Sequence, residues 1–188
     1  MRYPRHGHHV TSFADNYFVV TGSRKDTNDA SNKCELYDIQ KNQITALANM
    51  RNGRHYHSSC EFNGEWVYVI CGIKNSTKKY FSSIERLNVR NTINNFNEQW
   101  QDVHLKTNAG IAMEIPARQG NGSTQCNADS IIILGGFGGK FFKDSWVINT
   151  NTNVVSQTSD QPSTELFPFA MPTVYDSQSD SVLTVCWK

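Results

Sequence analysis

The chain has 188 residues, a formal net charge of +1 and 19% charged residues, which fits one modest domain. This balance gives no reason to expect a nucleic-acid partner, and no apolar run is long enough to span a membrane. Five cysteines without Cys-x-x-Cys spacing favour buried, reduced thiols, and the N-terminus lacks the apolar segment of a signal peptide. We therefore expect a cytoplasmic protein, with a cytoskeletal setting as one option, and no cofactor.

An internal repeat begins at the first residue. The segment MRYPRHGH at residues 1–8 returns as MRNGRHYH at residues 50–57, an offset of 49, and a weaker third copy lies at residues 115–120. Each copy leads into an apolar run that ends in glycine. The runs occupy residues 17–22, 66–72 and 131–136. The arginines Arg5, Arg54 and Arg118 precede the glycines Gly22, Gly72 and Gly136 by 17, 18 and 18 residues.

A second strand signal follows each glycine. It starts at Glu35, Glu85 and Trp146 in the three copies. A position for a large apolar side chain comes next, filled by Ile44, Trp100 and Val155. A fourth copy begins near residues 182–186. We therefore place repeats at residues 1–49, 50–113 and 114–164, with a partial repeat at 165–188, all in a single domain.

The order and spacing of these landmarks resemble the kelch repeat, whose period is about 50 residues. The landmarks are an Arg-x-x-His-like start, an apolar run ending in glycine, an acidic strand and a downstream tryptophan. As structural residues of the repeat we single out Arg5, Arg54, Arg118, Gly22, Gly72, Gly135, Gly136, Trp100 and Trp146. The third copy keeps both glycines, whereas the others pair Thr21 with Gly22 and Cys71 with Gly72.

The residue types predict an all-β fold independently of the resemblance to the kelch repeat. Short runs rich in Val, Ile, Tyr and Phe alternate with turn signals such as Asn63-Gly64. In the second repeat we expect strands near residues 57–62, 66–70, 83–88 and 99–103. One four-stranded sheet cannot bury both faces, so we expect about three and a half antiparallel blades stacked as a partial β-propeller. Another chain or a second copy is expected to complete the ring, unless the chain belongs to a larger protein.

Two loops that join the second and third strands of a blade carry aromatic residues beside lysines. We predict that these residues bind a protein partner: Lys78, Lys79, Tyr80, Phe81, Lys140, Phe141 and Phe142. The alternative is that the aromatic rings pack under their own loops. Serine at the four aromatic positions should distinguish the two, because only packed rings would lower the melting temperature when lost. The second repeat also contains about 14 extra residues in its loops. These residues either contribute to partner binding or are a tolerated insertion without a function of their own.

Catalytic and metal-binding alternatives rest on fewer residues. His6, His8 and His9 cluster, and His55 with His57 repeat part of the pattern, but a motif present in every repeat is more often structural. Ser58 and Ser59 lie beside His57, but adjacent residues on a strand face opposite ways, so we do not expect them to act on each other. The glycines at 135–139 lack the spacing of a phosphate-binding loop.

The resemblance implies a non-enzymatic protein–protein interaction scaffold, acting as a subunit or adaptor in a larger assembly. The alternative is a metal- or cofactor-dependent enzyme whose site lies at the propeller axis around His6 and His55.

Overall fold

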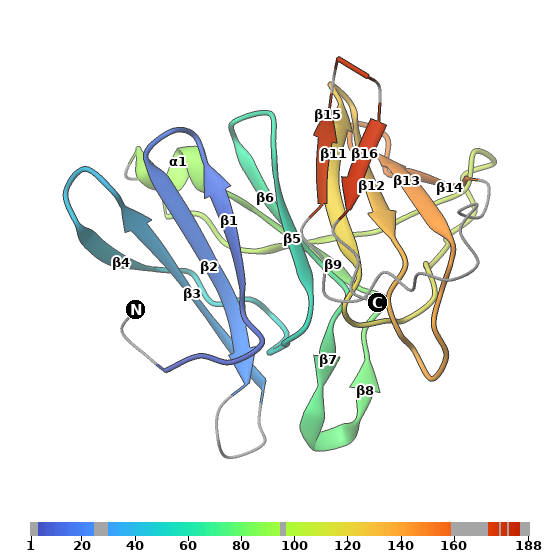
Figure 1. Cartoon of the computed structure of the whole chain (residues 1–188), viewed down its shortest axis with the longest axis horizontal. Coiled ribbons are helices and arrows are strands. Elements are labelled where there is room, and N and C mark those ends of the chain that lie inside the picture. The colour runs from blue at the N-terminus through green and yellow to red at the C-terminus, as the bar shows by residue number, and fades with distance from the viewer. Residues whose placement is uncertain are drawn as a thin grey trace.

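The computed structural model describes residues 4–24, 30–94, 97–158, 173–176, 178–179 and 181–184 (Figure 1). These residues form an all-β structure with three four-stranded antiparallel sheets and two short two-stranded ones. The coarse fold prediction is therefore confirmed. In the described part of the chain no helix is long and apolar enough to cross a bilayer, since the only α-helix has five residues.

Each four-stranded sheet corresponds to one repeat, and we call it a blade. Blade 1 consists of β1 (His9–Phe13), β2 (Tyr17–Arg24), β3 (Ala30–Asp38) and β4 (Gln43–Leu47). Blade 2 consists of β5 (Ser58–Phe62), β6 (Trp66–Ile70), β9 (Ile84–Asn88) and β10 (Gln101–Val103). Blade 3 consists of β11 (Gly122–Asn127), β12 (Ser130–Leu134), β13 (Ser145–Asn149) and β14 (Val154–Gln157).

Short elements complete the described structure. The loop after β6 holds a hairpin of β7 (Ile73–Lys74) and β8 (Lys79–Tyr80), joined by the 3-10 turn Asn75–Thr77. Helix α1 (Val89–Ile93) follows β9, and its first turn is capped by the Asn88 side chain. A final hairpin pairs β15 (Thr173–Asp176) with β16 (Ser181–Thr184).

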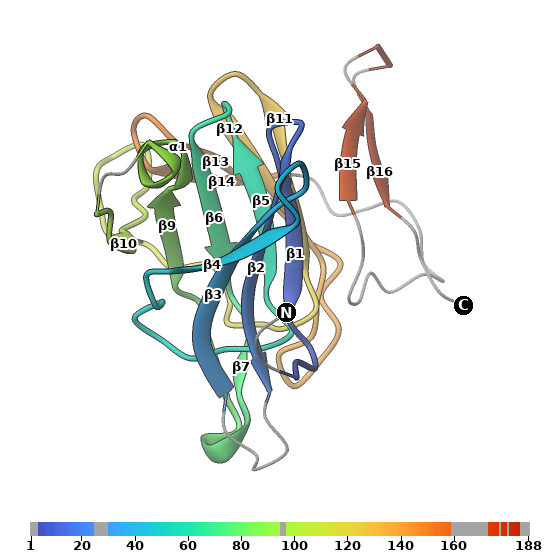
Figure 2. The same cartoon turned by 90° about the vertical axis from the view of Figure 1, so that its left-hand side faces the viewer.

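The first strands of successive repeats lie side by side. Strand β1 contacts β5, β5 contacts β11, and β11 contacts β15. The remaining strands of each blade fan outward from this row, as the two views in Figures 1 and 2 show. The tight turns between first and second strands gather at one end of the stack, the turn end. The loops between second and third strands gather at the opposite end, the loop end.

Two apolar cores lie between the blades. Phe13, Val19 and Leu36 of blade 1 pack against residues of blade 2 that include Val67 and Leu87. The opposite face of blade 2 packs on Ile131, Ile133, Trp146, Ile148 and Val155 of blade 3. Each sheet thus buries apolar side chains through its neighbour, as expected for repeats that cannot form a core alone.

Three buried arginines hold the loop end of the blades together. Each guanidinium donates to a backbone carbonyl oxygen 17 residues later, and each forms an ion pair with a carboxylate of the same blade. The arginine–acceptor pairs are Arg5 with Gly22, Arg54 with Cys71 and Arg118 with Gly135, at 2.7, 2.7 and 2.8 Å. The carboxylates are Glu35, Glu85 and Asp144. We call these three arginines the pin arginines.

The hydrogen bonds of the pin arginines correct the alignment of the three repeats at their glycines. Gly22, Cys71 and Gly135 are equivalent, because all three accept from a pin and have φ of 58°, 61° and 55°. The spacing from the arginine is therefore 17 in every blade, not 17, 18 and 18. Blade 2 places a cysteine in this left-handed conformation, which costs roughly 1–2 kcal/mol relative to glycine.

The predicted tryptophans have distinct structural roles. Trp146 occupies the strand position that glutamate fills in the other blades, since it pairs with Ile133 as Glu85 pairs with Val69. The carboxylate is supplied two residues earlier by Asp144, which accepts a hydrogen bond from Trp146 Nε1 at 2.7 Å. Trp100 is buried and donates from Nε1 to the Ala48 carbonyl oxygen at 2.9 Å, which ties blade 2 to the end of blade 1.

The extra residues of the second repeat pack on the blades. The segment after β10 crosses to blade 3, where the Lys106 backbone bonds Asn153 and Val155 beside β14. Leu105 and Ile115, near the ends of this segment, are buried in the core between blades 2 and 3. Part of the insertion therefore shields the outer edge of blade 3.

Candidate functional site

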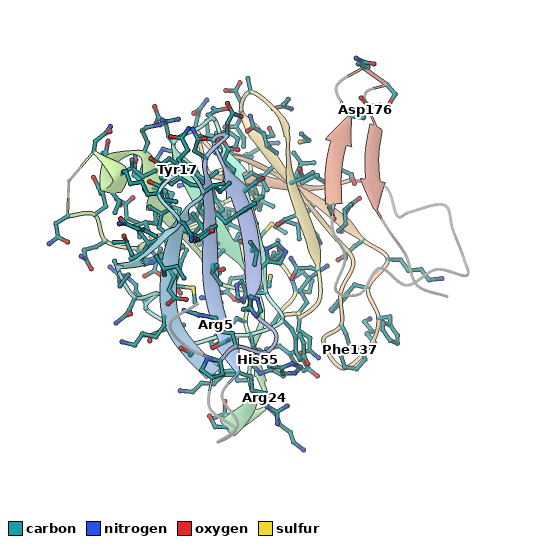
Figure 3. The ribbon with its side chains drawn as sticks, turned by 60° about the vertical axis from the view of Figure 1, so that its left-hand side comes forward. Arg5, Tyr17, Arg24, His55, Phe137 and Asp176 are labelled. Atoms are coloured by element: carbon teal, nitrogen blue, oxygen red, sulfur yellow. The ribbon has the colours of Figure 1, made fainter. Side chains whose placement is uncertain are left out.

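An aromatic cluster lies at the loop end, between blades 2 and 3. Tyr80 from the β7–β8 hairpin meets Phe137 from the loop after β12, with ring centres 6.1 Å apart. Phe137 in turn meets Phe141 at 5.1 Å. Phe141 is 47% exposed, an unusual value for a phenylalanine. Figure 3 shows Phe137 at the end of the molecule opposite Asp176.

Exposed lysines border this cluster. Lys78 and Lys79 belong to the blade 2 loop and Lys140 to the blade 3 loop, and all three are exposed. We define the aromatic–lysine patch as Tyr80, Phe137, Phe141, Lys78, Lys79 and Lys140. The structure thus joins two of the seven predicted partner-binding residues, Tyr80 and Phe141, through Phe137, and the three predicted lysines lie on the same two loops.

Backbone hydrogen bonds hold the patch in place. The amides of Phe137 and Gln119 each donate to the other residue's carbonyl oxygen at 2.8 Å. The amide of Phe142 donates to the Gly136 carbonyl oxygen at 2.8 Å, which closes the loop that carries Phe141. The β7–β8 pairing fixes Tyr80 opposite Ile73. The three rings therefore sit on ordered backbone rather than on free loop tips.

Phe81 and Phe142 do not belong to the exposed surface that the sequence suggested. Phe81 is 8% exposed, and its ring lies 4.9 Å from the Arg54 guanidinium. Phe142 is half-buried, and its ring lies 4.2 Å from the Arg118 guanidinium. In each aromatic pair the second ring covers a pin arginine and the first lies on the opposite side, where it joins the aromatic cluster, because consecutive side chains of an extended segment point to opposite sides. For these two rings the structure favours the packing alternative.

Sequence reasoning missed Phe137. Phe137 lies within the glycine-rich segment Gly135-Gly136-Phe137-Gly138-Gly139, whose composition suggests a loop rather than a binding residue. A large aromatic residue between two glycine pairs was the available signal. Its partner Tyr80 is 57 positions earlier, a separation that no local pattern reveals.

The two loops that carry the patch and the tight turns between first and second strands differ in the sign of their charge. The loops at residues 71–83 and 135–144 contain five lysines and one acid, Asp144, which is already paired with Arg118. The turns at residues 14–16, 63–65 and 128–129 contain Asp15, Glu65 and Asp129 and no lysine or arginine. Among the described residues, no carboxylate lies within ion-pair distance of Lys78, Lys79 or Lys140. The patch therefore has unneutralised positive charge.

Asp144 links the patch to the pin beneath it. Its carboxylate accepts two hydrogen bonds from Arg118, at 2.6 and 2.8 Å, and one from Trp146. Burial raises the pKa of Asp144, but these hydrogen bonds outweigh burial and leave the pKa below its ordinary value. The carboxylate is therefore ionised at neutral pH and holds the base of the loop that carries Phe137 and Phe141.

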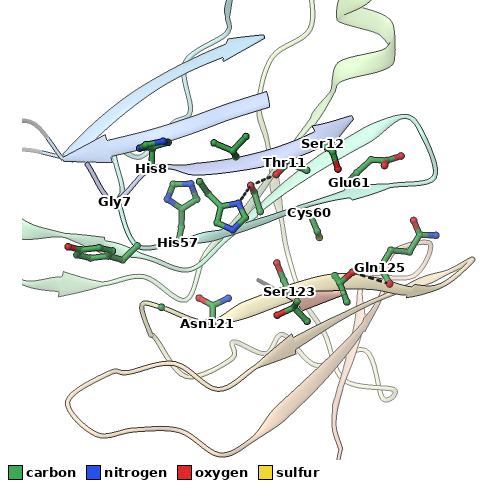
Figure 4. A pocket seen from close by; sticks show the side chains of 17 residues that line it. Gly7, His8, Thr11, Ser12, His57, Cys60, Glu61, Asn121, Ser123 and Gln125 are labelled. Carbon is green, nitrogen blue, oxygen red and sulfur yellow. Dashed lines mark hydrogen bonds between the residues drawn. The ribbon is translucent and has the colours of Figure 1, made fainter. Parts of the chain in front are cut away.

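A second candidate site lies along the row of first strands. Figure 4 shows this pocket of about 660 Å³ between β1, β5 and β11, with Thr173 of β15 also lining it. Its walls carry hydroxyl, amide and imidazole groups and one carboxylate, Glu61. The predicted axial residues His6 and His55 do not line it; they pack with Tyr56 at the loop end instead.

The pocket contains a serine–histidine contact between two blades. Ser59 Oγ lies 2.8 Å from His9 Nδ1 and also contacts the Thr11 hydroxyl. Burial, and then the nearby His8, lower the pKa of His9 to about 4. A base this weak activates a serine poorly at neutral pH, and Ser59 is only 4% exposed. The contact is therefore better explained as a polar link between β1 and β5.

The remaining reactive groups of the pocket have the same inert character. Burial raises the pKa of the Cys60 thiol to about 12, so it is not a thiolate at neutral pH. The His57 ring bonds the Thr21 hydroxyl at 2.8 Å, and burial lowers its pKa well below the ordinary value. Within the ranges that the structure describes, no group of three or more His, Cys, Asp or Glu side chains is arranged to hold a metal ion.

Comparison with known proteins adds no relative. No protein-family model matches the chain, and a search of curated proteins gives no match.

Proposed function

We propose that this chain is a kelch-type propeller segment that acts as a non-enzymatic scaffold and binds a protein partner through the aromatic–lysine patch. The single observation that carries the proposal is the cluster of Tyr80, Phe137 and Phe141 at the loop end, where one exposed and two half-buried rings are held by ordered backbone. Aromatic residues on a rigid base are typical anchors of protein interfaces, because little conformational entropy is lost when they are buried.

The threefold repetition of the pin supports the propeller part of this proposal. In each blade an arginine bonds the same carbonyl position and a carboxylate of its own sheet. Adjacent blades are also joined at the equivalent position. The Ser23 amide donates to the Arg54 carbonyl oxygen at 3.2 Å, and the Gly72 amide donates to the Arg118 carbonyl oxygen at 2.8 Å. One interface thus recurs from blade to blade, as stacking around an axis requires.

The outer face of blade 1 supports a place in a larger assembly. Phe18 and Ile39 are 38% and 42% exposed, whereas Val67 and Val89 are fully buried against blade 1. The strand registers make Phe18 equivalent to Val67 and Ile39 equivalent to Val89. We propose that a further blade of the same repeat, from another chain or a second copy, covers this face and continues the ring.

Site-specific photo-crosslinking tests the binding function. A benzophenone amino acid at Phe141 should give a discrete adduct in an extract of the native source, because this ring is exposed inside the patch. The same probe at Glu65, an exposed turn-end residue, is the matched control. Adducts that are absent at position 141, or equal at both positions, would contradict the proposal.

A further inference from the structure

We infer that the partner segment recognised by the aromatic–lysine patch is acidic, with carboxylates interspersed with aliphatic side chains. This inference rests on the proposed function and specifies its ligand. It follows from the charge of the patch, from the packing of its rings and from the contrast with the turn end.

The three lysines of the patch lack intramolecular carboxylate partners in the described structure. Each is exposed, and only Lys79 has another charge-related contact, with its Nζ 6.0 Å from the centre of the Phe81 ring. By comparison, the exposed Lys41 at the turn end is paired with Asp38 at 3.1 Å. A single exposed ion pair contributes little, but several charges of one sign raise the local concentration of an acidic partner and its association rate.

The rings supply the apolar part of the recognition. Tyr80 and Phe137 pack nearly edge-to-face, with an interplanar angle of 72°, and Phe137 with Phe141 at 64°. The cluster therefore forms one apolar surface contributed by two blades. An aliphatic side chain can lie on this surface while neighbouring carboxylates reach Lys79 of one loop and Lys140 of the other. Because both loops are fixed by backbone bonds, little ordering is needed on binding.

The ring geometry argues against a nucleic-acid ligand. Stacking of successive bases needs open aromatic faces, and cationic side chains must follow the phosphate backbone. Here the rings pack edge-to-face against one another rather than in a row of parallel faces, and the positive charge comes from three lysines on two loops. A peptide that alternates carboxylates with aliphatic groups matches this arrangement better.

Fluorescence anisotropy with defined probes tests the inference. The first probe is a fluorescein-labelled peptide of repeated Glu-Glu-Leu triplets. The second replaces every Glu by Gln, and the third is a labelled oligothymidylate. We expect the Glu peptide to bind about tenfold more tightly than the Gln peptide, and its affinity to fall as salt rises from about 50 to 500 mM.

Variants assign the binding to the patch. The triple variant Lys78→Gln, Lys79→Gln, Lys140→Gln should lose the preference for the Glu peptide, and Phe141→Ser should weaken the Glu and Gln peptides alike. Lys41→Gln, which removes an exposed lysine at the turn end, should leave binding unchanged. Tighter binding of oligothymidylate than of the Glu peptide would overturn the inference in favour of nucleic acid.

The outcomes separate the inference from the proposed function. Crosslinking at Phe141 without preference for the Glu peptide would refute the acidic ligand and leave the binding function standing. Failure of crosslinking would refute the function itself. An unaltered preference in the lysine triple variant would refute the assignment of charge recognition to the patch.

Discussion

The loop end and the turn end of the blade stack are built by the same strands but differ in chemistry. At the turn end, hairpins of two or three residues carry single acids such as Asp15 and Asp129. At the loop end, longer connections carry the aromatic–lysine patch over a layer of buried ion pairs. The pairing of the first and second strands determines the conformation of the short turns. The conformation of the longer loops depends instead on side chains that contact neighbouring blades. Surfaces for recognition can therefore develop at the loop end without disturbing the sheets.

The largest expected effect is at the buried layer of the loop end. Arg118→Met should lower the free energy of unfolding by about 3–5 kcal/mol, because Asp144 is left buried without its main partner. Arg51→Met is the matched control, since Arg51 is exposed and its pair with Asp102 lies at the surface. That change should cost less than about 1 kcal/mol. Chemical denaturation measures both, and equal losses would contradict the pin assignment.

The second-largest effect on stability is expected at the two rings beneath the patch, Phe81 and Phe142. Phe81→Ser should cost about 3 kcal/mol, because the ring is buried and covers the Arg54 guanidinium. Phe142→Ser should cost less, since that ring is only half-buried. Thermal melting of the two variants checks this order. A melting temperature unchanged by Phe81→Ser would show that the ring has no structural role.

Acid should destabilise the row of first strands. The pKa of His9 is lowered to about 4 by burial and then by His8, and that of His57 is lowered by burial and then by His9, Arg54, His55 and His8. These folded-state values lie below the ordinary 6.5, so the unfolded chain binds more protons and stability falls as pH drops from 6.5 towards 4. Stability that is flat across this window, measured by urea denaturation, would contradict the assigned burial.

A single substitution isolates the His57 contribution. Asn121 takes the equivalent place in blade 3, immediately before its first strand, and donates to Ser58 Oγ. His57→Asn should therefore be tolerated at a cost of about 1 kcal/mol for the altered Thr21 contact. It should also reduce the acid dependence. An unaltered pH profile would place the titrating group elsewhere.

The smallest effect on stability is expected for side chains of the aromatic–lysine patch that lie at or near the surface. Tyr80→Ser with Lys79→Gln should change the free energy of unfolding by less than about 0.5 kcal/mol per site, because these side chains lie at or near the surface. Glu65→Gln at the turn end should be equally neutral. Only the loop-end changes should reduce crosslinking from Phe141. A loss caused by Glu65→Gln would remove the distinction between the two ends.

Much of the fold could be predicted from the sequence because its signals are local. In the second repeat the expected second strand, residues 66–70, coincides with β6, and the other three strands differ by at most two residues at either end. Apolar runs between turn residues identify strands directly. The glycine alignment was wrong by one residue in blades 2 and 3, because Cys71 adopts a conformation usually left to glycine and blade 3 offers two adjacent glycines, Gly135 and Gly136. Only the pin contacts reveal that equivalence.

The site was predicted less completely, because its geometry depends on contacts between blades. The two loops were identified by composition, but which ring of each aromatic pair points outward depends on the arginine beneath it. Phe137 joins Tyr80 only through the stacking of blades 2 and 3. The kelch resemblance and the scaffold function stay predictions, since they concern partners and relatives rather than the described contacts.

One paired experiment tests the two-layer organisation of the loop end most directly. The double variants Tyr80→Ser/Phe141→Ser and Phe81→Ser/Phe142→Ser remove the same number of rings from the same loops, and each is assayed for melting temperature and for binding of the Glu-Glu-Leu peptide. The outer pair should lose binding with an unchanged melting temperature, whereas the inner pair should melt at a much lower temperature. An equal decrease in melting temperature in both double variants would contradict the two-layer organisation. Peptide binding that Tyr80→Ser/Phe141→Ser leaves unchanged would contradict it as well.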